Sequence, residues 1–217
     1  MLNFLYESYE IKKLDRLRFY LFLALLVLTY FIAIVSRVEN DPVFQSYENI
    51  ITFTSLVGTV LFCVYGVVLF SLNVFKREVT LSPKLFLLQA TIISITSLVS
   101  FVISYTACIV IFFITENLFP IVSDDLSFSI VLNAFTVIIP LAIVVGFLNI
   151  ISMGMGFLMR KSTTVSILTS ILFIDAVQRA LNSGWSIYII EGILLFISSL
   201  ILGLIMIHLK NKRASFF

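Results

Sequence analysis

The chain contains a long run without a charged residue at 126–159, which reads LSFSIVLNAFTVIIPLAIVVGFLNIISMGMGFLM. A helix needs about 20 apolar residues to cross a hydrocarbon core about 30 Å thick, so this run is long enough to span a membrane. Four further charge-free runs lie at 19–36, 49–75, 85–115 and 192–209. A shorter run at 162–174 becomes a sixth span if Asp175 and Arg179 belong to its helix. The pattern predicts an all-α integral membrane protein with six transmembrane helices.

Composition supports this class. Of the 217 residues, 60% are hydrophobic and 12% are charged, and the mean hydropathy is +1.14, whereas a soluble domain has about 25% charged residues. The net charge of +2 gives no basic patch for nucleic acid. We expect a single transmembrane domain over 1–217, with spans at about 18–36, 50–74, 85–115, 128–159, 162–181 and 186–209. The third and fourth spans are too long for a bilayer, so parts of them must tilt, bend or leave it.

The basic residues predict the orientation, because cytoplasmic flanks and loops hold an excess of Lys and Arg. Only Arg37 and Arg179 fall in the segments assigned to the outside. The other twelve of the 14 basic residues are Lys12, Lys13, Arg16, Arg18, Lys76, Arg77, Lys84, Arg160, Lys161, Lys210, Lys212 and Arg213. Both termini are therefore expected in the cytoplasm.

Chemistry-bearing motifs are missing from the sequence. His208 is the only histidine, so the chain cannot supply the imidazole ligands of a membrane zinc protease. It lies at the cytoplasmic end of the last span, where we expect no serine at the same depth for it to activate as the base of a serine protease. No G-x-x-x-x-G-K-[ST] loop is present, so any ATP dependence must come from a partner. Spans one to four carry no charged residue in their interiors, which disfavours a proton-driven carrier. We expect no catalytic residue, no metal site and no directly bound cofactor.

Two segments combine apolar and basic residues at the predicted inner surface. In the segment 9–18, apolar residues recur every three or four positions opposite lysines and arginine, which indicates an amphipathic interfacial helix or a positively charged anchor. The inner loop 73–84 mixes a charge cluster with apolar residues; it is either a connecting amphipathic fragment or a short helix seated in a groove of another protein. The residues at its centre are Phe75, Lys76, Arg77, Glu78 and Val79.

Charged side chains occur inside the last two spans. Asp175 and Arg179 are four positions apart on the fifth span, so they share one helix face in the favourable acid-first order. Glu191 on the sixth span is expected at a similar depth and competes for Arg179. These three residues are intramembrane polar or gate candidates, and the alternative is a purely structural pair at the outer rim.

Small residues mark where helices can approach or bend. One face of the third span carries Ala90, Ser94, Ser97, Ser104 and Cys108, which lets another helix pack closely in lipid. The fourth span contains Pro140, Gly146, Gly154 and Gly156. Pro140 removes a helical hydrogen bond, so this span is expected to be bendable.

The whole layout resembles the membrane subunit of an ABC-2 type transporter. The resemblance rests on the amphipathic lead-in at 7–18, Glu78 ahead of Ser82-Pro83-Lys84, the Arg160-Lys161-Ser162 loop, and six helices with both ends inside. It implies a separate cytoplasmic ATP-binding subunit that carries ATP and Mg²⁺, and a second permease subunit, identical or paralogous. It also implies that the first inner loop, Lys76 to Val79, contacts the ATPase. Only about 182–185 connects the last two spans, so the outer re-entrant helices of larger relatives look truncated.

The same resemblance implies a bacterial cytoplasmic membrane protein that exports an amphipathic or hydrophobic substrate, an antimicrobial or cytolytic peptide or bacteriocin above all, as in producer immunity. A nearly charge-free interior is compatible with such a passenger and unsuited to a small hydrophilic one. Two other classes stay open: the substrate-binding membrane subunit of a vitamin importer, which also has six helices in about 200 residues, and a non-transporting membrane scaffold.

Overall fold

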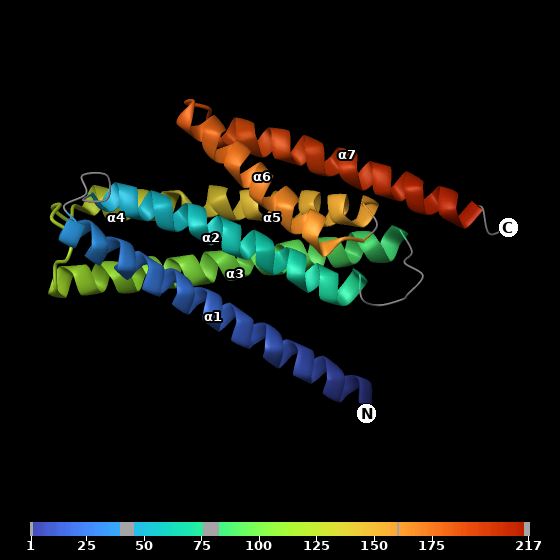
Figure 1. Cartoon of the computed structure of the whole chain (residues 1–217), viewed down its shortest axis with the longest axis horizontal. Coiled ribbons are helices and arrows are strands. Elements are labelled where there is room, and N and C mark those ends of the chain that lie inside the picture. Colours follow the sequence, from blue (N-terminus) through green and yellow to red (C-terminus); the bar gives the residue numbers. More distant parts are fainter. Residues whose placement is uncertain (1, 40–45, 76–82, 160, 215–217) are drawn as a thin grey trace. The chain divides into compact units, whose positions relative to one another are not determined.

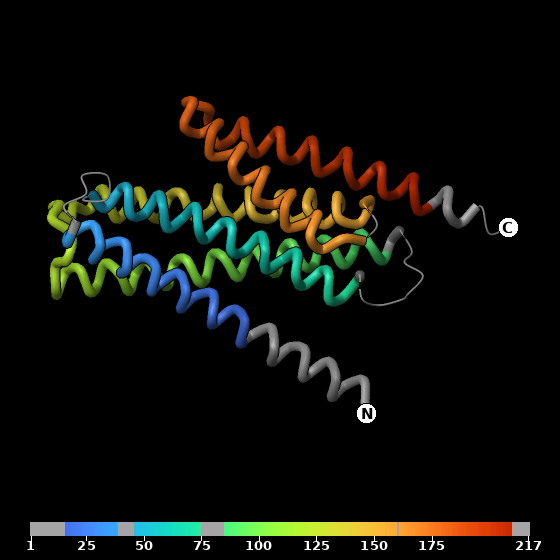
Figure 2. Tube along the Cα trace, in the orientation of Figure 1, coloured from blue at the N-terminus to red at the C-terminus, as the bar shows by residue number. Residues whose placement is uncertain are grey.

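The computed structural model describes the backbone of residues 2–39, 46–75, 83–159 and 161–214, which Figure 2 shows in large part in colour. Side chains are described within 16–38, 46–74, 85–159 and 161–209. All regular structure in these ranges is helical. The helices are α1 (Leu2–Glu39), α2 (Tyr47–Phe70), α3 (Pro83–Leu118), α4 (Phe128–Thr136), α5 (Ile138–Leu158), α6 (Thr163–Asn182) and α7 (Ile187–Ala214), and a π-helical turn (Ser71–Phe75) follows α2 (Figure 1).

Six stretches in the described part of the chain are long and apolar enough to cross a membrane. They are Arg16–Val38, Tyr47–Val74, Leu85–Leu118, Phe128–Leu158, Thr163–Asn182 and Ile187–Leu209. The prediction of an all-α chain with six such helices is confirmed over these residues, and the chain is a multi-pass membrane protein by this criterion. The amphipathic segment 9–18 is helical and continuous with the first span, within α1.

The helices belong to two compact units. Unit 1 comprises Met1–Gly58 and Ser100–Ile139, and unit 2 comprises Thr59–Val99 and Pro140–Phe217. Each unit has its own hydrophobic core, in which phenylalanine and tyrosine rings are prominent.

In unit 1, polar and aromatic side chains connect α1, α2 and α3 to one another. The Thr29 hydroxyl lies 3.3 Å from that of Thr54 and 3.5 Å from the Cys108 sulfur. Tyr105 donates a hydrogen bond to the carbonyl oxygen of Ile51 at 3.1 Å and stacks on Phe101. These contacts give helices in an apolar environment polar partners, which the hydrocarbon core itself cannot supply.

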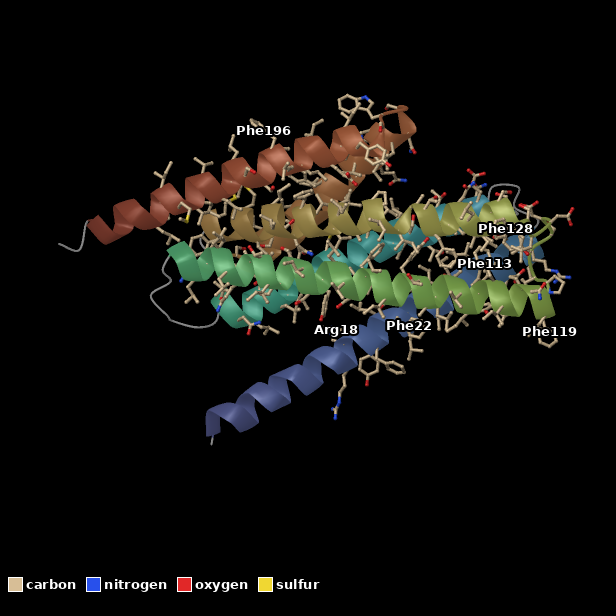
Figure 3. The ribbon with its side chains drawn as sticks, turned by 180° about the vertical axis from the view of Figure 1, so that it is seen from behind. Arg18, Phe22, Phe113, Phe119, Phe128 and Phe196 are labelled. Carbon is tan, nitrogen blue, oxygen red and sulfur yellow. The ribbon has the colours of Figure 1, made fainter. Side chains whose placement is uncertain are left out.

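In unit 2, an aromatic cluster joins three helices at one end. The Phe86 ring of α3 lies 5.4 Å from Phe70 of α2 and 4.7 Å from Phe157 of α5, centroid to centroid. The helices α6 and α7 also belong to this unit, and they contact one another. Much of α7 faces outward: Phe196 is 69% exposed and points away from the helix (Figure 3).

The fourth predicted span is two helices instead of one. It breaks at Val137, where α4 ends and α5 begins. Pro140 explains the break, because it has no N–H to donate to the carbonyl of Thr136 four residues earlier, and its ring crowds that carbonyl. The interruption lies about one turn before the proline itself, and the backbone of Val137 stays in the right-handed helical region, with φ −82° and ψ −12°.

Candidate functional site

Small residues and hydroxyls line the contact between α5 and α6 in unit 2. Ser170 donates a hydrogen bond to the hydroxyl of Ser152 at 2.8 Å, and both residues are fully buried. One turn away, a Cβ added to Gly156 would collide with the hydroxyl of Ser166. These four residues, spaced four apart on each helix, form a small-x-x-x-small pair that lets the two backbones approach closely. We call them the hydroxyl seam.

A second polar feature joins α2 and α5 in the same unit. Asn149 is 0% exposed, and its side-chain amide lies against the Cα of Gly66. Neither its oxygen nor its nitrogen has a hydrogen-bond partner among the described residues. Buried amides are nearly always hydrogen-bonded, so this residue calls for an explanation.

The α2–α3 contact adds two serines to this polar interior. Ser97 donates a hydrogen bond to the carbonyl oxygen of Phe62 at 2.6 Å. Ser94, about one turn away, is buried as well, and its hydroxyl has no partner in the described part of the chain. The interior of unit 2 thus offers neutral donors and acceptors, which can hold a hydrogen-bonding group and carry no charge themselves.

A carboxylate organises one end of unit 1. Glu116 is only 2% exposed, and its Oε2 accepts hydrogen bonds from the hydroxyl of Tyr47 at 3.0 Å and from the backbone N–H groups of Ile121 and Val122 at 3.1 Å each. We call this arrangement the Glu116 clasp. It ties the start of α2 and the turn after α3 to the end of α3. The three donors satisfy the buried charge, so the clasp has the features of a structural element.

The charged pair on α6 is formed and lies on the surface of the chain. Asp175 Oδ2 is 2.9 Å from Arg179 Nη2, and the two side chains are 51% and 78% exposed, respectively. Glu191 on α7 is half-buried, and its Oε1 has no hydrogen-bond partner among the described residues. The ion pair that the structure shows for Arg179 is with Asp175, and the competition of Glu191 for Arg179 stays a prediction.

The proposed ATPase-coupling residues cannot be placed. Lys76, Arg77, Glu78 and Val79 lie outside the described residues, and so does the side chain of Phe75. The π-helical turn Ser71–Phe75 directly precedes these residues. Within it, the hydroxyl of Ser71 forms a hydrogen bond with the hydroxyl of Thr163 at the start of α6. π-Helical turns are rare and occur disproportionately at functional sites.

Two buried residues, Asn149 in unit 2 and Glu116 in unit 1, were not predicted from the sequence. Asn149 is the only amide or charged side chain between Asn133 and Arg160, and that isolation in an apolar run is a signal that pattern reading can use. Glu116 offered no such signal, because an acidic residue next to a predicted outer loop is ordinarily solvated. Among the described residues no group of His, Cys, Asp and Glu is placed to hold a metal ion.

Comparison with known proteins adds no family assignment, because no protein-family model, curated protein or solved structure matches the chain.

Proposed function

We propose that the chain is the membrane-spanning permease subunit of an ABC exporter, moving an amphipathic or hydrophobic substrate, an antimicrobial or cytolytic peptide above all, with ATP hydrolysed by a separate cytoplasmic subunit. The proposal places the protein in a bacterial cytoplasmic membrane, next to a second permease subunit. It rests on the six-helix layout and on the motifs that carry the resemblance to ABC-2 permeases.

The observation that carries this proposal is the distribution of charge in the interior. Among the described residues, Glu116 is the one charged side chain that is buried, and it lies at the end of α3 with three donors around its carboxylate. Ion-driven carriers use intramembrane carboxylates as relays. An interior lined by apolar groups, hydroxyls and one amide favours a transporter whose energy comes from a partner.

The exposed pair on α6 supports the second subunit. Of the six candidate spans, α6 is the one with the smallest buried share, and it carries Asp175 and Arg179 on its surface. Asp175 lies seven residues before the end of α6 at Asn182, or about 10 Å at 1.5 Å per residue. Charges at this depth are costly against lipid, and a neighbouring permease would shield them.

The orientation proposed with this function has both termini in the cytoplasm, with the lead-in 9–18 at the inner membrane surface. Because basic residues concentrate on the proposed inner side, we expect a cysteine introduced at Asp124 to react with an impermeant thiol reagent in intact cells. A cysteine introduced at Ser215 should react only after permeabilisation. The native Cys63 and Cys108 are both buried and serve as the unreactive background. The reverse labelling pattern would overturn the orientation.

Co-purification tests the partner. We expect the tagged protein, extracted from its native membrane, to bring down an ATPase with a phosphate-binding loop. We expect Glu78→Lys and Phe75→Asp each to weaken that association about fivefold or more, since each costs about 1–3 kcal/mol of binding free energy. Glu48→Lys is the matched control, because Glu48 is exposed at the opposite end of α2. Purification without an ATPase, or equal association in all three variants, contradicts the proposal.

A further inference from the structure

Five buried polar atoms of unit 2 lack partners among the described residues. Two of them, Oε1 of Gln89 and Oε1 of Glu191, belong to partly exposed residues. The other three belong to buried residues and are Oδ1 and Nδ2 of Asn149 on α5 and the hydroxyl oxygen of Ser94 on α3. Asn149 is 0% exposed and Ser94 is 4% exposed. Each such atom costs about 1–3 kcal/mol if it stays unpaired. The helices that carry these atoms determine whether one ligand can satisfy all three.

The contacts of α3 with α5 put the two residues at the same level. These helices are antiparallel: Leu98 lies against Gly146 at one point, and Phe86 packs on Phe157 at another. Between these two contacts the numbers on α3 fall as those on α5 rise. Interpolation therefore places Asn149 within about one residue of the level of Ser94 along the helix axes.

The third helix meets the same level. Two contacts show that α2 runs antiparallel to α3. The Ser97 hydroxyl donates a hydrogen bond to the carbonyl oxygen of Phe62, and the Phe70 ring packs on the Phe86 ring. Gly66 follows Phe62 by four residues and Ser94 precedes Ser97 by three, so in this antiparallel pair the two lie within about one residue of the same level. Independently, the Cα of Gly66 is the surface against which the Asn149 amide rests. Glycine is required here, because a Cβ would occupy the place of the amide.

The site is deep in the predicted membrane. Asn149 precedes the end of its candidate span, Leu158, by nine residues, and Ser94 follows the start of its span, Leu85, by nine. At 1.5 Å per residue each is about 13 Å from that end, near the middle of a hydrocarbon core about 30 Å thick. Lipid offers no hydrogen bonds at that depth.

We propose that Gly66, Ser94 and Asn149 form a binding site for an internal water molecule that links α3 to α5 beside α2. Both polar side chains, those of Ser94 and Asn149, are neutral, so an ion bound there would be an uncompensated charge in a low dielectric. A water molecule matches the site, because buried waters make about three hydrogen bonds and these residues offer one amide oxygen, one amide nitrogen and one hydroxyl. The site depends on the packing of unit 2 and holds whether or not the protein transports.

Magnetisation transfer from water to the Asn149 side-chain amide tests this site. The full chain, with ¹⁵N-labelled asparagine, is reconstituted in lipid nanodiscs, and the Asn149 signal is identified by its disappearance in Asn149→Leu or, if that variant does not fold, Asn149→Asp. We expect rapid transfer in the unmodified protein. Ser94→Ala should slow the transfer about twofold or more, since the water then loses one of about three partners.

Ser97→Ala is the matched control. It removes a hydroxyl of the same helix that already donates to Phe62, so it should leave the transfer unchanged. The proposal is overturned if the amide of the unmodified protein receives no magnetisation from water. It is also overturned if Ser94→Ala and Ser97→Ala have the same effect.

Discussion

The close contact between Gly66 and Asn149 makes Gly66→Ala a sharp test of the packing in unit 2. The added Cβ would lie 2.6 Å from Cγ and 2.7 Å from Nδ2 of Asn149 and nearer still to Oδ1, where ordinary contacts are 3.4–4 Å. The amide must therefore retreat by about 1 Å within a packed interior, and overpacking of this kind costs about 1–3 kcal/mol. We expect the free energy of unfolding, measured by detergent titration in mixed micelles, to fall by that amount.

Two further variants isolate this cause. Gly203→Ala adds the same methyl group on α7, where a Cβ meets nothing within 4 Å, so it reports the intrinsic helix preference of alanine, a gain of up to about 1 kcal/mol. Asn149→Ala removes the colliding amide, so the double variant Gly66→Ala with Asn149→Ala should show a coupling energy of about 1–3 kcal/mol. The reasoning is refuted if Gly66→Ala is as stable as Gly203→Ala, or if the two changes are additive.

The remaining predictions concern the charged groups. Glu116→Ala should lower the free energy of unfolding by about 3 kcal/mol or more, because it leaves three donors unpaired, while the exposed Glu48→Ala should change it by less than about 0.5 kcal/mol; similar values for both would remove the clasp as a stabilising element. Asp175→Asn and Arg179→Gln should each cost less than about 1 kcal/mol in detergent, because the pair is exposed. A loss of several kcal/mol from either single change would mean that the pair is buried in the purified protein.

The spans could be predicted closely from the sequence. Each of the twelve span ends in the structure lies within three residues of the expected position. The reason is physical: a spanning helix must be apolar over its whole length, so charged residues such as Arg16 and Glu48 mark its ends without reference to other helices. The small-residue face of the third span could also be predicted from residue spacing along a single helix, and all five of its residues are buried.

The polar interior could not be predicted in the same way. The clasp depends on Tyr47 meeting Glu116 across 69 residues of chain, and the amide of Asn149 depends on Gly66 across 83. Such pairings are set by which helices adjoin and at what register, and composition along one helix carries no information about either. Sequence reading did single out Asp175 and Arg179, because their partner lies one turn away on the same helix.

The interruption at Val137 changes which part of the fourth hydrophobic stretch has to match the thickness of the bilayer. Phe128–Leu158 as one rod would be about 46 Å long at 1.5 Å per residue, half as long again as the hydrocarbon core, and could fit only with a steep tilt. By contrast, α5 alone, with its 21 residues, extends about 31 Å, which equals the thickness of that core. The nine residues of α4 are then more than one crossing of that core requires. A single proline thereby places the interruption of an over-length hydrophobic segment at the point that leaves one helix of bilayer length after it.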